Sequence, residues 1–102
     1  MGVNGITVDA YVIDTLMRDL VGHDRQPSAY LVYLFLWSLT GGPDGGPGAV
    51  SLREIAEGTG LSKRAVQAGL GRLQRRRLIR IERAGITAIP EYTVLRPWAA
   101  RR

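Results

Sequence analysis

Residues 51–78 read SLREIAEGTGLSKRAVQAGLGRLQRRRL, and this stretch decides the fold. Ser51 followed three residues later by Glu54 has the pattern of a capping box, which predicts the start of a helix. Ser62 offers a second N-cap, and the apolar residues after it recur three and four positions apart. The stretch therefore predicts two amphipathic helices, joined by a turn of about three residues that contains Gly60.

Two segments rich in β-branched residues follow these helices. They predict a hairpin over residues 78–95, with a tight turn at "RAG" and with Arg80 and Arg83 near its tip. Pro90 has no N–H group to donate, so we expect the second strand to lie at the edge of the sheet there. A short β-like segment from Ala49 precedes the first of the two helices.

The region upstream predicts two more helices and a loop. Residues 9–21 have amphipathic helical spacing, with Asp9 as a candidate N-cap and Gly22 as a candidate stop. Residues 28–39 are apolar nearly all round, so this helix must be buried on most sides. Residues 40–48 hold five glycines and two prolines, which cannot continue a helix and need not be ordered.

The composition fits a single domain over residues 1–102. The chain has 45% apolar and 23% charged residues, enough for one modest core. It has no cysteine, which suits the cytoplasm, and its start has no secretion signal. The longest apolar run, residues 29–37, is too short to cross a membrane. We expect a mainly α protein with a small β-hairpin, of the α+β class, with no membrane association.

The charge is polarised along the chain. Residues 1–50 hold two bases and five acids, whereas residues 51–102 hold twelve bases and four acids. Residues 60–85 alone carry eight lysines and arginines against one acid, Glu82. Such asymmetry indicates a polyanionic partner, most often nucleic acid and less often an acidic membrane surface or an acidic protein.

The stretch from Ser51 to Gly85 resembles the winged helix-turn-helix domains of bacterial and phage transcription regulators and replication initiators, and the likeness extends over residues 28–96. The resemblance implies a helix-turn-helix over residues 51–77 and a wing hairpin over residues 78–95, with an extra N-terminal helix. The residues that carry it are Ile55-Ala56, Gly60-Leu61-Ser62, Val66, Leu70, Leu73 and Leu78-Ile79.

In such a domain, helix 62–77 enters the major groove of double-stranded DNA and the wing meets the backbone or the minor groove. The first turn of a helix presents free N–H groups and a partial positive charge to phosphates and base edges. An alternative is that Arg75, Arg76 and Arg77 only complement the helix dipole. The candidate base readers are Ser62, Lys63, Arg64 and Gln67; the candidate phosphate ligands are Arg72, Arg75 and Arg76, with Arg80 and Arg83 on the wing.

Two further patterns leave alternatives open. Gly69 and Gly71 each weaken the second helix by up to about 1 kcal/mol, which suggests a close approach of another helix or of a ligand backbone. Tyr30, Tyr33 and Trp37 form a stripe that fits the core better than an effector pocket.

We therefore expect sequence-specific binding of double-stranded DNA, in a bacterial or phage transcriptional regulator. The alternative is a protein interaction or replication-initiator module without independent specific DNA binding. His23 is the sole histidine and no acid–base pair stands out, so we expect no metal site, no cofactor and no enzymatic activity. The two N-terminal helices suggest a homodimer that binds two half-sites.

Overall fold

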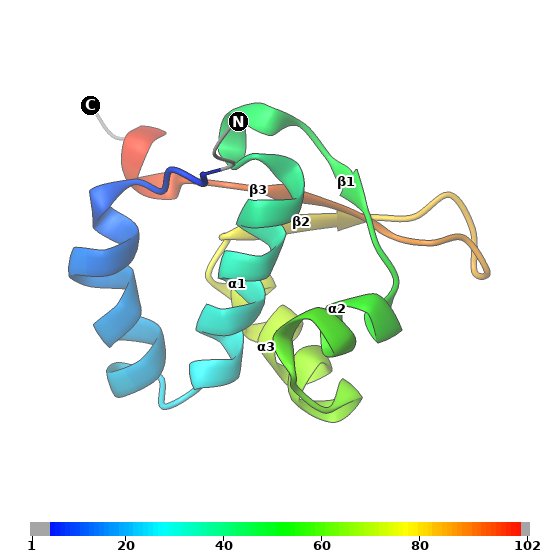
Figure 1. Cartoon of the computed structure of the whole chain (residues 1–102), viewed down its shortest axis with the longest axis horizontal. Coiled ribbons are helices and arrows are strands. Elements are labelled where there is room, and N and C mark those ends of the chain that lie inside the picture. Colours follow the sequence, from blue (N-terminus) through cyan, green and yellow to red (C-terminus); the bar gives the residue numbers. More distant parts are fainter. Residues whose placement is uncertain (1–4, 101–102) are drawn as a thin grey trace.

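The computed structural model describes residues 5–100, so the ends of the predicted domain, residues 1–4 and 101–102, lie outside the described part. The fold is mainly helical with a small antiparallel sheet, which confirms the predicted α+β class (Figure 1). The helices are η1 (Val12–Leu16), η2 (Arg18–His23), α1 (Pro27–Thr40), η3 (Pro43–Gly45), α2 (Leu52–Thr59), α3 (Lys63–Arg75) and η4 (Pro97–Ala100); the strands are β1 (Gly48–Ala49), β2 (Ile79–Glu82) and β3 (Glu91–Val94).

The helix α1 is the centre of the fold. The N-terminal helix, a continuous helical stretch of residues 10–23 that includes η1 and η2, lies on one side of α1, and α2 and α3 lie on the other (Figure 1). The N-terminal helix buries a row of residues four apart, Val12, Leu16 and Leu20, in the common core. Its backbone is mostly π-helical, which means that N–H groups donate hydrogen bonds to the carbonyl of the fifth residue before them.

Both predicted ends of the N-terminal helix need correction. The carboxylate of Asp9 does not cap the helix, because it accepts a hydrogen bond from Trp98 Nε1 at 3.2 Å and pairs with Arg96 Nε at 3.3 Å. Gly22 lies inside η2, which continues to His23. A glycine weakens a helix but does not end one where packing continues beyond it.

The aromatic stripe of α1 lies in the core, as predicted. Tyr30, Tyr33 and Trp37 are nearly or fully buried, and each directs its polar atom at a backbone carbonyl. These bonds join α1 to the N-terminal helix, to the segment before that helix and to the segment after β3. The bonds are Tyr30 Oη to Val12 O (2.9 Å), Tyr33 Oη to Leu95 O (2.8 Å) and Trp37 Nε1 to Thr7 O (2.9 Å).

The sheet has the strand order β1-β3-β2, so the expectation that the second hairpin strand is an edge strand is wrong. Residues 83–90 connect β2 to β3, a longer connection than the predicted tight turn. Glu82 pairs with Glu91, so the next pair in this register would join Arg83 to Pro90. Because Pro90 has no N–H group, pairing stops there, while its carbonyl accepts a bond from Val50 N–H at 3.3 Å.

The glycine- and proline-rich loop of residues 40–48 is held by specific hydrogen bonds and close contacts. Thr40 Oγ1 donates to Leu36 O at 2.9 Å and accepts from Gly42 N–H at 3.2 Å. Gly42 has a φ of +94°, and a Cβ atom at Gly45 would overlap the carbonyl of Thr40. Close packing at the end of α1 therefore requires glycine at positions 42 and 45, and this part of the loop has a defined conformation.

Candidate nucleic-acid interface

The two helices of residues 51–78, which we call the central stretch, have the caps that the sequence predicts. Ser51 Oγ accepts from Glu54 N–H at 3.1 Å, and the Glu54 carboxylate accepts from Ser51 N–H at 2.9 Å. The helix α2 ends at Gly60, whose φ of +78° is in the left-handed region that favours glycine. The turn of residues 60–62 then leads into α3, so the predicted three-residue turn is confirmed.

In the sequence, Gly58 is a second candidate, beside Gly60, for the residue that ends the first of these helices. Gly58 lies inside α2 and does not end it. A Cβ atom at this position would overlap the ring of Phe35, so the absence of a side chain lets α2 pack closely against α1. This contact fixes the position of α2, which in turn supports α3.

Ser62 caps α3. Its Oγ accepts a hydrogen bond from Ala65 N–H at 3.1 Å, and its backbone is extended. The cap occupies the acceptor side of the hydroxyl, while the hydroxyl hydrogen remains able to donate to a phosphate or a base. Lys63 follows in the first helical turn and is exposed.

The outward side of α3 carries three of the predicted DNA ligands. Arg64, Gln67 and Arg75 are exposed, and their spacing places them on one side of the helix with Ala68 and Gly71 between them. We call these five residues the outward face of α3. The opposite side is buried in the core through Val66, Gly69, Leu70 and Leu73.

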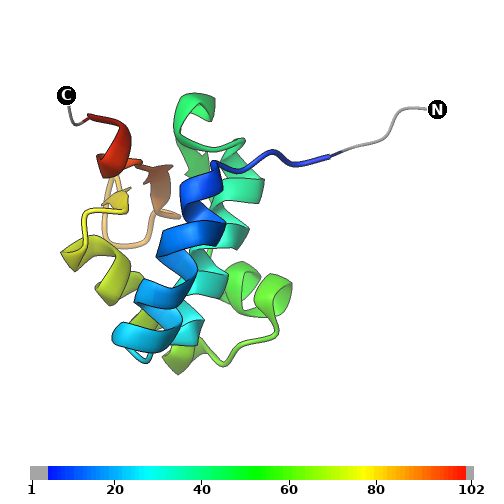
Figure 2. The same ribbon diagram turned by 90° about the vertical axis from the view of Figure 1, so that its left-hand side faces the viewer.

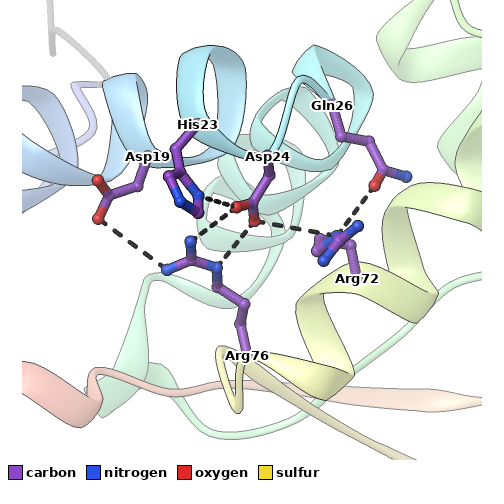
Figure 3. Close-up of polar contacts among 6 residues, drawn as sticks. All are labelled: Asp19, His23, Asp24, Gln26, Arg72 and Arg76. Atoms are coloured by element: carbon purple, nitrogen blue, oxygen red, sulfur yellow. Dashed lines mark hydrogen bonds and ion pairs between the residues drawn. The ribbon is translucent and has the colours of Figure 1, made fainter.

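Arg72 and Arg76 lie on a third side of α3 and contact the N-terminal segment (Figure 3). Arg76 donates from Nε and Nη2 to the two carboxylate oxygens of Asp24, both at 2.8 Å. Arg72 Nε donates to Gln26 Oε1 at 3.1 Å and lies 3.9 Å from Asp24. These two predicted phosphate ligands are therefore engaged within the fold, on a different side of α3 from the outward face.

The carboxylate of Asp24 is nearly out of solvent, with a side chain 4% exposed. Hydrogen bonds from Arg76 lower the pKa of Asp24 from 3.8 to about 2, with a smaller contribution from His23, whereas burial opposes the shift. Asp19 lies 4.0 Å from Arg76 Nη1 and adds a second negative charge. This arrangement, which we call the Asp24 cluster, compensates the charge of Arg76 and leaves less of it for an external anion.

The hairpin places its two predicted ligands differently. Arg80 is exposed on the outer face of the sheet, opposite Thr93, and on the same side as the like-charged pair of Glu82 and Glu91. Arg83 follows β2 and borders a groove of about 460 Å³ between α3 and the hairpin. Residues that line this groove include Ser51, Gln67, Leu70, Arg83, Ile89 and Tyr92.

The structure thus brings Gln67 and Arg83 to one groove. Arg80 instead borders a depression with Gln74 and Arg77 at the C-terminal end of α3. Arg77 was not among the predicted ligands; it is exposed and has a φ of +59°. The sequence contains no signal for this left-handed backbone, since arginine is uncommon there.

The two glycines of α3 differ in what a side chain at each position would contact. A Cβ atom at Gly69 would lie 3.1 Å from Ala29 Cα and 3.2 Å from Ser28 O, so this glycine serves the contact with α1. A Cβ atom at Gly71 would meet only the mobile end of Arg75, at 3.5 Å. Packing within the described residues therefore requires Gly69 but gives no reason for Gly71.

This difference predicts opposite effects of alanine. Gly71→Ala is expected to stabilise the protein by up to about 1 kcal/mol through helix propensity. Gly69→Ala is expected to destabilise it by about 1–2 kcal/mol, because backbone atoms of the neighbouring helix must move. Urea unfolding of both variants measures the difference, and equal effects at the two positions would contradict the assignment.

Within residues 5–100, no helix has both the length and the apolar character needed to cross a bilayer. The same residues contain no group of three or more histidine or acidic side chains placed to hold a metal ion. Comparison with known proteins found no match among family models, curated proteins or solved structures.

Proposed function

We propose that the chain binds double-stranded DNA as a winged helix-turn-helix protein, in which α2 and α3 form the helix-turn-helix and the hairpin of β2, β3 and the loop of residues 83–90 forms the wing. The outward face of α3 enters the major groove in this proposal. The observation that carries it is the composition of this face, where Arg64, Gln67 and Arg75 are exposed around the small residues Ala68 and Gly71.

The small residues are suited to a close approach. An α-helix fits the major groove, and its distance from the bases depends on the side chains in between. Gly71 costs helix stability that internal packing does not require, which is understandable where a ligand comes close to the backbone. Arg64 can donate two hydrogen bonds to guanine, and Gln67 can bond adenine in a bidentate manner.

The charges on this side of the molecule favour a polyanion. The helix α3 contains no acid. Among the residues that the structure describes, the five other predicted basic ligands form no ion pair, in contrast to Arg72 and Arg76. These bases are Lys63, Arg64, Arg75, Arg80 and Arg83.

A second candidate function is protein binding. Ile86 and Ile89 on the hairpin loop are 94% and 56% exposed, and such an apolar tip also suits a protein surface. Binding to a protein through this apolar tip would depend weakly on salt. Binding of the five basic side chains to DNA phosphates would depend on salt strongly.

The test is titration of a labelled random duplex, followed by fluorescence anisotropy over a range of salt concentrations. We expect the logarithm of the affinity to fall with the logarithm of salt concentration at a slope of about −4.5, which is about −0.9 for each of the five basic side chains that neutralise a phosphate. Arg75→Ala should flatten the slope by about one unit. Arg72→Ala is the matched control on another side of α3 and should leave it nearly unchanged. Failure of the folded protein to bind duplex at low salt would reject the proposal.

A further inference from the structure

The N-terminal helix has an outer side that nothing in the described part of the chain covers. Figure 2 shows this helix nearest the viewer, with no other described segment in front of it. Residues four apart lie in one row along a helix, and the buried row already packs on α1. A second apolar row beside it stays in solvent: Ile13 is 50% exposed, Met17 39% and Val21 38%.

Two opposite charges border this exposed row. Asp14 and Arg18 are both exposed, and they occupy the next row along the helix. Neither side chain takes part in an ion pair within residues 5–100. The other three acids of the segment, Asp9, Asp19 and Asp24, all have basic partners inside the fold.

We propose that a second copy of this chain packs antiparallel on this helix, around a twofold axis near Met17. In such a pair, Asp14 meets Arg18 of the partner subunit, and the symmetry repeats the contact on the other side. The apolar row is also self-complementary, because Ile13 meets Val21 of the partner subunit and the two Met17 side chains meet at the axis.

The two sets of contacts fit one axis. Positions 14 and 18 are symmetric about position 16, and positions 13 and 21 are symmetric about position 17. With the axis at Met17, Asp14 and Arg18 of the partner subunit are offset by two residues, about 3 Å at the α-helical rise, which a long arginine side chain can span. A row with one acid and one base in this order thus matches its own copy, and this complementarity selects a second copy over an unrelated partner.

The proposal does not rest on DNA binding, since the residues of this face and those of the outward face of α3 are different. It is tested by sedimentation equilibrium of the full chain without DNA. We expect wild-type protein to be dimeric at tens of micromolar. Asp14→Arg and Arg18→Asp should each raise the dissociation constant by about tenfold or more, because each creates two like-charge contacts.

An equimolar mixture of the two single variants makes the test specific. In the mixed dimer, each substituted residue meets an opposite charge, so the dissociation constant should return to within about threefold of wild type. The double variant Asp14→Arg/Arg18→Asp should recover as well, and circular dichroism melts check that every variant is folded.

A pair of substitutions, one in the apolar row and one control elsewhere, tests the apolar contact. Met17→Glu should abolish the dimer, whereas Ile86→Glu, a similar change at an exposed residue of the hairpin loop, should not. A wild-type protein that stays monomeric throughout the concentration range would overturn the proposal. So would a mixture that associates no better than the single variants.

Discussion

Asp24→Ala is expected to lower the free energy of unfolding by about 2–3 kcal/mol, because it leaves Arg76 partly buried without its carboxylate. The effect should stay below that of a fully buried pair, since the side chain of Arg76 is 32% exposed. Urea unfolding measures it. The matched control is Glu57→Ala, which removes an exposed ion pair with Arg53 and should cost well under about 1 kcal/mol.

The same cluster predicts a dependence on acid. The pKa of Asp24 is about 2 in the folded protein, below its ordinary value of 3.8, so the carboxylate favours folding when it is ionised. This stabilisation is complete above about pH 4 and is lost as the pH falls toward 2. Asp24→Asn should lack this part of the acid dependence. An unchanged dependence on acid in Asp24→Asn would contradict the role of the cluster.

Arg64→Ala and Gln67→Ala are expected to lower the affinity for a preferred site by about 1–3 kcal/mol each, mainly at one base position. The site is first obtained by selection from random duplexes. Affinities are then measured for the selected site and its single-base variants. Loss of preference at one position identifies a base contact, whereas an equal loss for all sequences indicates a phosphate contact.

Arg72→Ala provides the comparison for these two variants. It changes the same helix on the side that faces Gln26 and Asp24, so it should alter stability without altering base preference. If Arg72→Ala changed the preference while Arg64→Ala and Gln67→Ala did not, the outward face of α3 would be wrongly assigned.

The parts of the fold that were predicted from sequence depend on local hydrogen bonds. Each helix cap bonds to backbone groups within three or four residues, so its sequence pattern can be recognised without the tertiary structure. These caps are the Ser51–Glu54 box, Gly60 and Ser62. The aromatic stripe of α1 is legible for a similar reason, because its spacing defines one helical face.

The parts that were not predicted depend on partners far away in the chain. Arg76 meets Asp24 across 52 positions, and nothing in the basic run distinguishes it from Arg75. The central place of β3 depends on β1, a strand of only two residues that comes before both helices of the central stretch. The N-terminal helix has ordinary amphipathic spacing, and this spacing does not distinguish a π-helix from an α-helix.

The most direct measurement of the central proposal is a map of backbone amide shifts by nuclear magnetic resonance, as unlabelled duplex DNA is added to labelled protein. We expect the largest chemical-shift changes in residues 62–75 and in the hairpin loop of residues 83–90, with small changes in the N-terminal helix. The opposite result, with shifts concentrated in residues 10–26 and an unchanged α3, would show that the outward face of α3 does not enter the groove.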